Sequence, residues 1–103
     1  MFKELSKLVK IIKKNKNKSS NISYTASLFK KGKNFCIKKF MEEARELAIS
    51  SKYFNKKNIV HEASDLLYHF LVLLELKKIK MSSIMNELKK RQRESGIEEK
   101  NNR

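Results

Sequence analysis

Five acidic residues are the side chains of this sequence that are best suited to chemistry. The chain has 103 residues with 25 Lys and Arg against 11 Asp and Glu, yet five of the acids fall between residues 42 and 65. They form two groups, Glu42, Glu43 and Glu46 followed by Glu62 and Asp65. Sets of carboxylate oxygens are the ligands that Mg²⁺ prefers, and Mg²⁺ commonly shares its coordination with phosphate. The acids therefore indicate magnesium-assisted chemistry on a phosphate compound.

Two helices must bring these acids together. Apolar spacing predicts one helix at about residues 34–51 and another at about 57–77, joined by the polar stretch 51–58. On the first helix the acids lie mostly opposite the apolar face, with Glu43 at its border, which taken alone is typical of a solvated face. On the second helix apolar residues point in every direction, so we expect it to be buried on all sides.

A buried carboxylate needs a positive partner, because burying the ionised group alone is costly. Helices joined by a short link run antiparallel, so the acids of the two helices are expected to face one another. Few lysines are near: Lys39 shares the acidic stripe, and Lys52 lies at the helix end. A divalent cation is the better counter-charge. The predicted Mg²⁺ ligands are Glu43, Glu46, Glu62 and Asp65.

The rest of the chain predicts an all-α protein. There is no Pro and only two Gly, and helix formers dominate. Further helices are expected at about residues 2–14, over 24–31 with Ser23 as N-cap and Gly32 at its end, and from Ser82 or Ser83 onward. Residues 1–94 are predicted to form one domain, followed by a disordered tail at 95–103. We expect about five helices in an antiparallel bundle that dimerisation completes.

The net charge of +14 indicates a polyanionic partner, and residues 1–40 carry +11 of it, from 12 Lys and one acid. Nucleic acid is disfavoured because only four basic residues are Arg and aromatic residues are not interleaved with the lysines. The longest apolar run, Leu66–Leu74, is too short to span a membrane, and no secretory signal is seen. The lone Cys36, expected to be a small buried hydrophobe, fits a reducing compartment. The prediction is a cytoplasmic protein with no nucleic-acid or membrane partner.

The two histidines do not form a zinc pair with each other. His61 and His69 lie eight residues apart on the predicted helix, which places them about 80° apart around its axis. A zinc pair of the i, i+4 kind needs a spacing of four. His69 is expected to be a hydrogen-bonded core or interface residue.

The acidic motifs resemble a known family. The pattern ExxE at Glu43–Glu46 and ExxD at Glu62–Asp65, separated by fifteen residues, resembles the all-α nucleotide pyrophosphohydrolases. More narrowly, the segments SYTASLFKKG (23–32), KKFMEEARELAISSK (38–52) and HEASDLLYHFLVLL (61–74) resemble the phosphoribosyl-ATP pyrophosphatases of histidine biosynthesis. The resemblance covers about residues 1–93. It implies a helical, cytoplasmic homodimer that uses Mg²⁺ to convert phosphoribosyl-ATP to phosphoribosyl-AMP and pyrophosphate.

The resemblance also implies roles for individual residues. The four predicted ligands would be metal-binding and catalytic, with Glu42 nearby as a further ligand or as the base. Lys39 and Lys52 match basic positions that flank the acidic motif. Tyr24, Thr25 and Lys31 fall in the segment that matches the family's SYT…KG, where contact with substrate and a purely structural role are both open. The sequence departs from the family at Phe40-Met41, at Ser64 and in the Lys/Asn-rich loop before residue 23, and each departure leaves the carboxylates in place.

Two other functions remain open at this point. A house-cleaning pyrophosphohydrolase with the same carboxylates could act on another nucleotide. A small basic bundle that binds nucleic acid would instead use the lysines, and its acids would be solvated or ion-paired. Magnesium dependence and pyrophosphate release distinguish the first class from the second.

Overall fold

The computed structural model describes residues 2–93, and within that range it contains five helices and no strand. The all-α prediction is therefore confirmed. The predicted tail at 95–103 lies outside the described residues. The helices are α1 (Lys3–Asn15), α2 (Tyr24–Lys31), α3 (Lys33–Tyr53), α4 (Lys56–Leu76) and α5 (Met81–Gln92).

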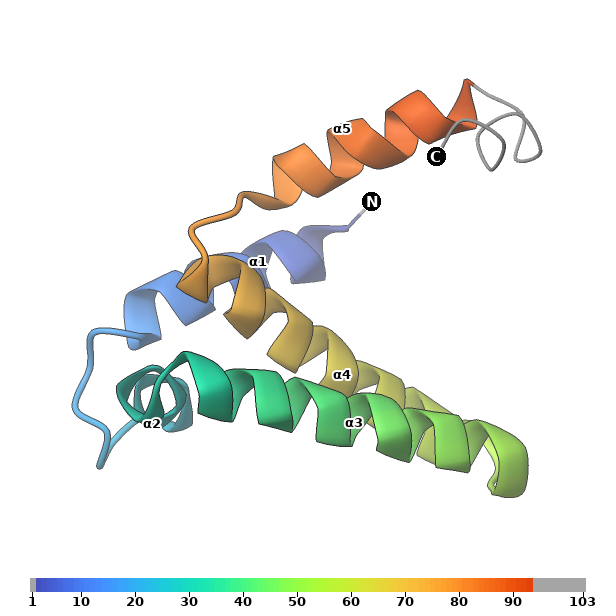
Figure 1. Ribbon diagram of the computed structural model, residues 1–103, viewed down its shortest axis with the longest axis horizontal. Helices are drawn as coiled ribbons and strands as arrows, with labels where there is room; N and C mark the ends of the chain where they lie inside the picture. Colours follow the sequence, from blue (N-terminus) through green and yellow to red (C-terminus); the bar gives the residue numbers. More distant parts are fainter. Residues whose placement is uncertain (1, 94–103) are drawn as a thin grey trace.

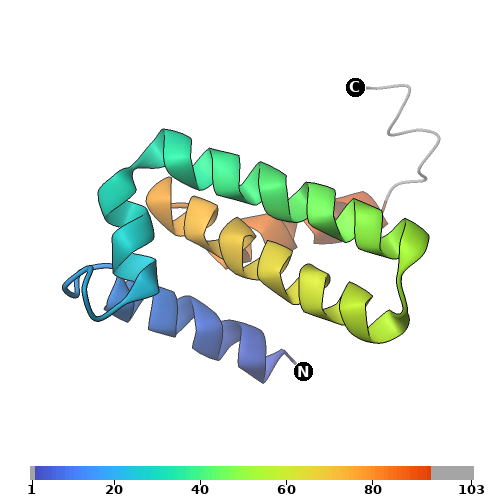
Figure 2. The same ribbon diagram turned by 90° about the horizontal axis from the view of Figure 1, so that it is seen from below.

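Helices α3 and α4 form a long antiparallel hairpin (Figure 1). Only Phe54 and Asn55 separate them, so the link is much shorter than the predicted stretch 51–58. Helix α3 continues to Tyr53, beyond its predicted end near residue 51. Asn55 has an extended backbone, and its side chain accepts a hydrogen bond from the Asn58 amide at 3.1 Å, so α4 is capped and begins at Lys56. Figure 2 shows α1 along the other side of α4, with α2 bridging one end of the layer.

The short helix α2 has the ends that the sequence predicts. The Ser23 hydroxyl accepts a hydrogen bond from the Ala26 amide at 3.1 Å, so Ser23 is the N-cap. Gly32 ends the helix with φ of 94°, a conformation that favours glycine. Helix α3 begins at the next residue, so this glycine makes the corner between α2 and α3.

The core lies where four helices meet. Its buried residues are Ile12 of α1, Leu28 of α2, Cys36 of α3, and Leu71 and Val72 of α4. Full burial of such a side chain contributes about 1.5–3 kcal/mol. The Cys36 thiol donates to the Leu28 carbonyl oxygen at 3.2 Å, and burial raises its pKa, so Cys36 is the buried hydrophobe that was expected.

Helix α4 is not buried on all sides, contrary to prediction. Its C-terminal half reaches the core through Leu71 and Val72, but Val60 and Leu67 of the same helix are exposed, 64% and 41% respectively. Within one chain, α1 and α3 cover only part of the helix. Helix α4 therefore carries more apolar side chains than a single chain buries.

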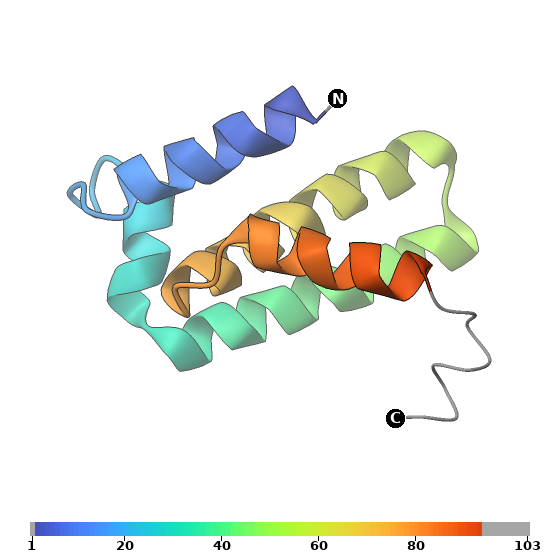
Figure 3. The same ribbon diagram turned by 90° about the horizontal axis from the view of Figure 1, so that it is seen from above.

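Helix α5 begins at Met81 after Lys80, so the predicted N-cap at Ser82 or Ser83 is wrong. Met81 packs against the core, whereas no residue of α5 is fully buried. Figures 1 and 3 show α5 leaving the C-terminal end of α4, and in Figure 1 it diverges from the α3–α4 hairpin. None of the helices within residues 2–93 is long and apolar enough to cross a membrane.

Candidate active site

The acids predicted to bind metal come together between α3 and α4. Carboxylate oxygens of Glu43, Glu46 and Glu62 lie within 4.8 Å of one another. Oxygens of Glu62 and Asp65 form a second such group with a ring nitrogen of His61. Glu62 belongs to both groups, so it joins the two halves of the cluster.

The hairpin explains this arrangement. Spacings of three residues place Glu43 beside Glu46 on α3, and Glu62 beside Asp65 on α4. Because the helices run antiparallel from a two-residue link, the two pairs meet at the same height along the hairpin. The burial differs from expectation: Glu43, expected at a border, is only 8% exposed, whereas Glu62 and Asp65 are partly exposed.

Two carboxylate oxygens of the cluster are buried without a hydrogen-bond partner. They are Oε2 of Glu43 and Oε2 of Glu62. The Ser50 hydroxyl, two turns along α3 from Glu43, is also buried without a hydrogen-bond partner. A buried polar atom left unpartnered costs about 1–3 kcal/mol, and more when it is charged. Oxygen donors that are buried, close together and unpaired fit a hard divalent cation.

The electrostatics of the cluster agree with this fit. Burial raises the pKa of Glu43, the neighbouring Glu46 and Asp65 raise it further, and Lys39 opposes the shift. The pKa of Glu62 is also raised, by desolvation first and then by Glu46, with His61 acting in the opposite direction. These acids destabilise one another's charged forms, and a bound cation would relieve that repulsion.

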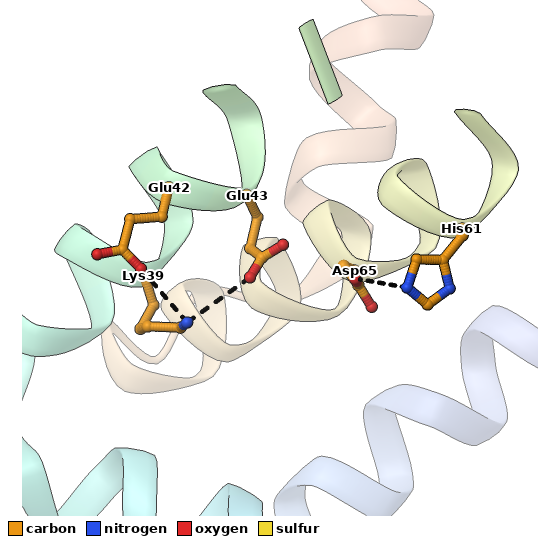
Figure 4. A network of polar contacts seen from close by, with 5 residues as sticks. All are labelled: Lys39, Glu42, Glu43, His61 and Asp65. Atoms are coloured by element: carbon orange, nitrogen blue, oxygen red, sulfur yellow. Dashed lines mark ion pairs between the residues drawn. The ribbon is translucent and has the colours of Figure 1, made fainter. Parts of the chain in front are cut away.

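Lys39 forms ion pairs at the edge of the cluster (Figure 4). Its ammonium lies 3.3 Å from a Glu42 oxygen and 3.7 Å from a Glu43 oxygen. Burial lowers the pKa of Lys39, but the hydrogen bond to Glu42 and the charges of Tyr24, Glu42 and Glu43 outweigh this and raise it overall. Lys39 thus stays protonated and holds Glu42 at the edge of the site.

An aromatic cluster lies beside Lys39, one turn of α4 beyond Asp65. The Tyr24 ring stacks on Tyr68 at 6.2 Å and meets His69 edge-on at the same distance. The Thr25 and Tyr68 hydroxyls are 2.5 Å apart, so Thr25 fixes the first turn of α2 to α4. His69 is buried, as expected, and burial lowers its pKa, with Lys39 lowering it further.

Lys31 and Lys52 each contact an aromatic ring close in the chain: Lys31 of α2 contacts a ring of α3, and Lys52 contacts a ring of its own helix. The Lys31 ammonium lies 4.6 Å from the centroid of the Phe35 ring, and that of Lys52 lies 5.4 Å from the centroid of the Tyr53 ring. Among the described residues, neither lysine forms an ion pair with the acids of the site. Lys39 is the flanking lysine that the fold brings to the cluster.

Sequence reasoning missed three neighbours of the site, which are His61, Tyr68 and His69. His61 Nε2 lies 3.4 Å from Asp65 Oδ2. The spacing of four between His61 and Asp65 could have revealed this pair, since residues at i and i+4 share a helix face. The contacts of Tyr68 and His69 with Tyr24 depend on how α2 packs, which no local pattern specifies.

Comparison with known proteins agrees with the geometry. Residues 5–92 match the profile of the family described as phosphoribosyl-ATP pyrophosphohydrolase. The chain is 41% identical over 99 residues to the phosphoribosyl-ATP pyrophosphatase of Vesicomyosocius okutanii, covering 96% of this chain and 94% of that protein. It is 46% identical over 87 residues to the phosphoribosyl-ATP pyrophosphatase of Clostridium acetobutylicum, covering 84% and 79%.

A longer relative contains the same region. The histidine biosynthesis bifunctional protein HisIE of Wolinella succinogenes is 52% identical over 81 residues, which cover 79% of this chain and 35% of that protein. The shared part is thus about one third of the bifunctional relative. With the profile spanning nearly the whole helical domain, the chain belongs to the phosphoribosyl-ATP pyrophosphohydrolase family.

Proposed function

We propose that this protein hydrolyses phosphoribosyl-ATP to phosphoribosyl-AMP and pyrophosphate with the help of Mg²⁺, the second step of histidine biosynthesis, in the cytoplasm. The observation that carries the proposal is the carboxylate cluster, in which Oε2 of Glu43 and Oε2 of Glu62 are buried and unpartnered. Membership of the family and the activity for which its relatives are named supply the substrate.

The residues that would hold Mg²⁺ are Glu43, Glu46, Glu62 and Asp65. When bound, the ion would neutralise charge on the phosphates and lower the pKa of a coordinated water. The protein's own contribution is to fix the four carboxylates on two antiparallel helices. The burial of Glu43 and the partial burial of Glu62 limit the access of bulk water to them.

Lys39 and Glu42 are the two further residues that we expect to act at the reacting phosphate group. A substrate phosphate would draw the Lys39 ammonium away from Glu42, to which it is bound at 3.3 Å in the free protein. Glu42 would then be free to act as a further ligand or as the base that accepts a proton from water. Tyr24 and Thr25, with Lys31 and Lys52, are the further residues we assign to substrate binding.

The exposed Tyr24 is the best placed of these for contact with a nucleotide base. Its side chain is 56% exposed and its ring is already stacked on Tyr68, so one face of the aromatic cluster stays open to solvent. Thr25 is buried against Tyr68, and its role would be to hold Tyr24 in position.

The test is pyrophosphate release from phosphoribosyl-ATP with and without Mg²⁺. We expect Glu62→Gln and Asp65→Asn each to abolish the Mg²⁺-dependent reaction while circular dichroism shows the helices intact. Glu4→Gln, which removes an exposed acid of α1 far from the cluster, is the matched control and should keep full activity. Near-wild-type turnover of either site variant at saturating Mg²⁺ would contradict the ligand assignment. Pyrophosphate release from other nucleotides alone would identify a house-cleaning enzyme.

A further inference from the structure

Tyr24 is exposed on the first turn of a short helix, and this position alone would leave its ring poorly fixed. Helix α2 has only eight residues, and Tyr24 is the first of them. Helices of this length are marginal by themselves, and helix ends fray. The link at 16–23 that precedes α2 contains no helix or strand. A stacking surface for a nucleotide base therefore needs support from another part of the molecule.

Tyr68 of α4 supplies that support through two contacts. Its hydroxyl lies 2.5 Å from Oγ1 of Thr25, the buried residue next to Tyr24. Its ring stacks on that of Tyr24, with the ring centroids 6.2 Å apart and the ring planes 25° from parallel. Burial raises the pKa of the Tyr68 hydroxyl, and the hydrogen bond with Thr25 opposes that shift. Tyr68 therefore keeps its proton at neutral pH, and the hydrogen bond that fixes α2 persists.

His69 limits the Tyr24 ring on a second side. It is buried, and its ring meets the rings of Tyr24 and Tyr68 nearly at right angles, at centroid distances of 6.2 and 5.1 Å. Edge-on contacts of this kind are favourable beyond the apolar area that they bury. With Tyr68 on one side and His69 on another, few orientations are open to the Tyr24 ring.

The same support connects the Tyr24 ring to the carboxylate cluster. Tyr68 and His69 follow Asp65 by three and four residues on α4, so all three side chains lie on one face of that helix. The position of the ring relative to Asp65 is thus set by contacts with one continuous helix. It does not depend on the link before α2.

We propose that Tyr68 is a positioning residue, which acts through Thr25 and Tyr24 to hold a preformed stacking surface for the base of the substrate. The inference rests on the proposed function, which assigns contact with the base to Tyr24. A ring that is already held loses little conformational freedom when a base stacks on it, and this raises affinity. Because the phosphates would bind at the carboxylates, the effect of Tyr68 is confined to the base.

The test measures the binding of each product by calorimetry in Mg²⁺, so it requires no turnover. Phosphoribosyl-AMP carries the base, and pyrophosphate does not. Tyr68→Phe keeps the ring and removes the hydroxyl. We expect it to weaken phosphoribosyl-AMP binding about three- to tenfold, the range of one hydrogen bond, and to leave pyrophosphate binding unchanged. Tyr53→Phe, the same change at a tyrosine that is 69% exposed, is the matched control and should bind both products as the wild type does.

A double variant tests whether Tyr68 acts through Tyr24. Tyr24→Ala should weaken phosphoribosyl-AMP binding, because it removes the stacking surface. Adding Tyr68→Phe to Tyr24→Ala should cause no further loss, since the ring that Tyr68 holds is then absent. Circular dichroism of each variant checks that the helices persist.

Three results would overturn the proposal: unchanged phosphoribosyl-AMP binding by Tyr68→Phe, equal losses for both products, and an additive loss in the double variant. Equal losses would mean that the change disturbs the whole site. A wild type that binds phosphoribosyl-AMP but releases no pyrophosphate from phosphoribosyl-ATP would contradict the proposed reaction alone. A wild type that does not bind phosphoribosyl-AMP would contradict both the proposed function and the role of Tyr68.

Discussion

Glu43 is the acid whose environment changes most when the chain folds, because it is buried beside two other carboxylates. Burial raises its pKa, followed by the effects of Glu46 and Asp65. The folded state therefore holds the Glu43 proton more tightly than the unfolded state does. A group with a raised pKa stabilises the fold below its unfolded pKa, and that contribution is lost as the pH rises through the folded pKa.

This predicts a pH-dependent difference between the metal-free wild type and Glu43→Gln. From about pH 4.5 upward, the free energy of unfolding of the wild type should fall relative to that of the variant, because only the wild type must bury a charge. Millimolar Mg²⁺ should reverse the difference near neutral pH. Urea unfolding across the pH range measures it, with Glu4→Gln as control. A constant difference between wild type and Glu43→Gln, unchanged by pH, would refute the prediction.

At the residue level, the sequence predicted the composition of the acidic cluster better than its burial. The spacings of Glu43 with Glu46 and of Glu62 with Asp65 follow from helix geometry, so the pairs were predictable. Which acid is buried depends on how closely α3 approaches α4 and on the ion pair of Lys39, and these are tertiary features. The expectation therefore placed burial on Glu62 and Asp65, whereas Glu43 is the buried acid.

At the element level, α2 positions Tyr24 and Thr25, and its cap is the part to test. Ser23→Ala removes the acceptor of the Ala26 amide and should cost about 1 kcal/mol of stability. Ser83→Ala is the matched control, because the sequence also predicted a cap near Ser83 but α5 begins earlier, after Lys80. We expect that control to change stability by no more than about 0.5 kcal/mol. Thermal unfolding of both variants checks the difference, and equal losses would contradict it.

The contrast between these two serines shows what local sequence can specify. Ser23 follows a polar loop and its hydroxyl caps the first turn of α2, so the start of this helix can be predicted from the local sequence. Helix α5 begins instead where Met81 packs against the core, after a turn in which Lys78 has φ of 57°. A tertiary contact thus overrides the capping preference of Ser82 and Ser83. The local sequence does not indicate this contact.

At the scale of the whole molecule, the positive charge should act on a small polyphosphate and not on a nucleic-acid duplex. Changing the exposed Lys10, Lys13, Lys14 and Lys18 together to Gln should leave Mg²⁺-dependent activity nearly unchanged, whereas Lys39→Gln should weaken substrate use. Activity should fall only shallowly with salt. A duplex binder would lose affinity with a log–log slope of ~0.9 per phosphate contact. Tight DNA binding that survives EDTA, together with no pyrophosphate release, would contradict this prediction.

Lys16 is left out of that set because it has a structural partner. Its ammonium lies 2.5 Å from a Glu75 oxygen, and the Glu75 side chain is only 13% exposed. The ion pair ties the link after α1 to the C-terminal end of α4. The sequence alone does not distinguish Lys16 from the other lysines of that stretch, because its ion-pair partner is 59 residues away in the chain.

The apolar face left open on the hairpin predicts association of two chains. A groove of about 400 Å³ lies between α3 and α4, lined by Phe40, Leu47, Ala63, Leu66, Leu67 and Phe70. On α4, Val60 and Leu67 are a heptad apart, with Ala63 between them on the same face, which is the spacing of helix-to-helix packing. Soluble monomers rarely expose a continuous apolar surface of this kind.

We therefore expect a homodimer in which this groove of one chain packs against that of its partner. Leu67→Glu places a charge at the centre of the groove, and burying it unpaired would cost more than the contact contributes, so this variant should be monomeric. Ile22→Glu changes an 80% exposed residue in the link before α2 and is the matched control, which should remain dimeric. Sedimentation at micromolar concentration distinguishes the two states. A wild-type chain that sediments as a stable monomer would show that α4 tolerates its exposed apolar face, and the dimer would have to be abandoned.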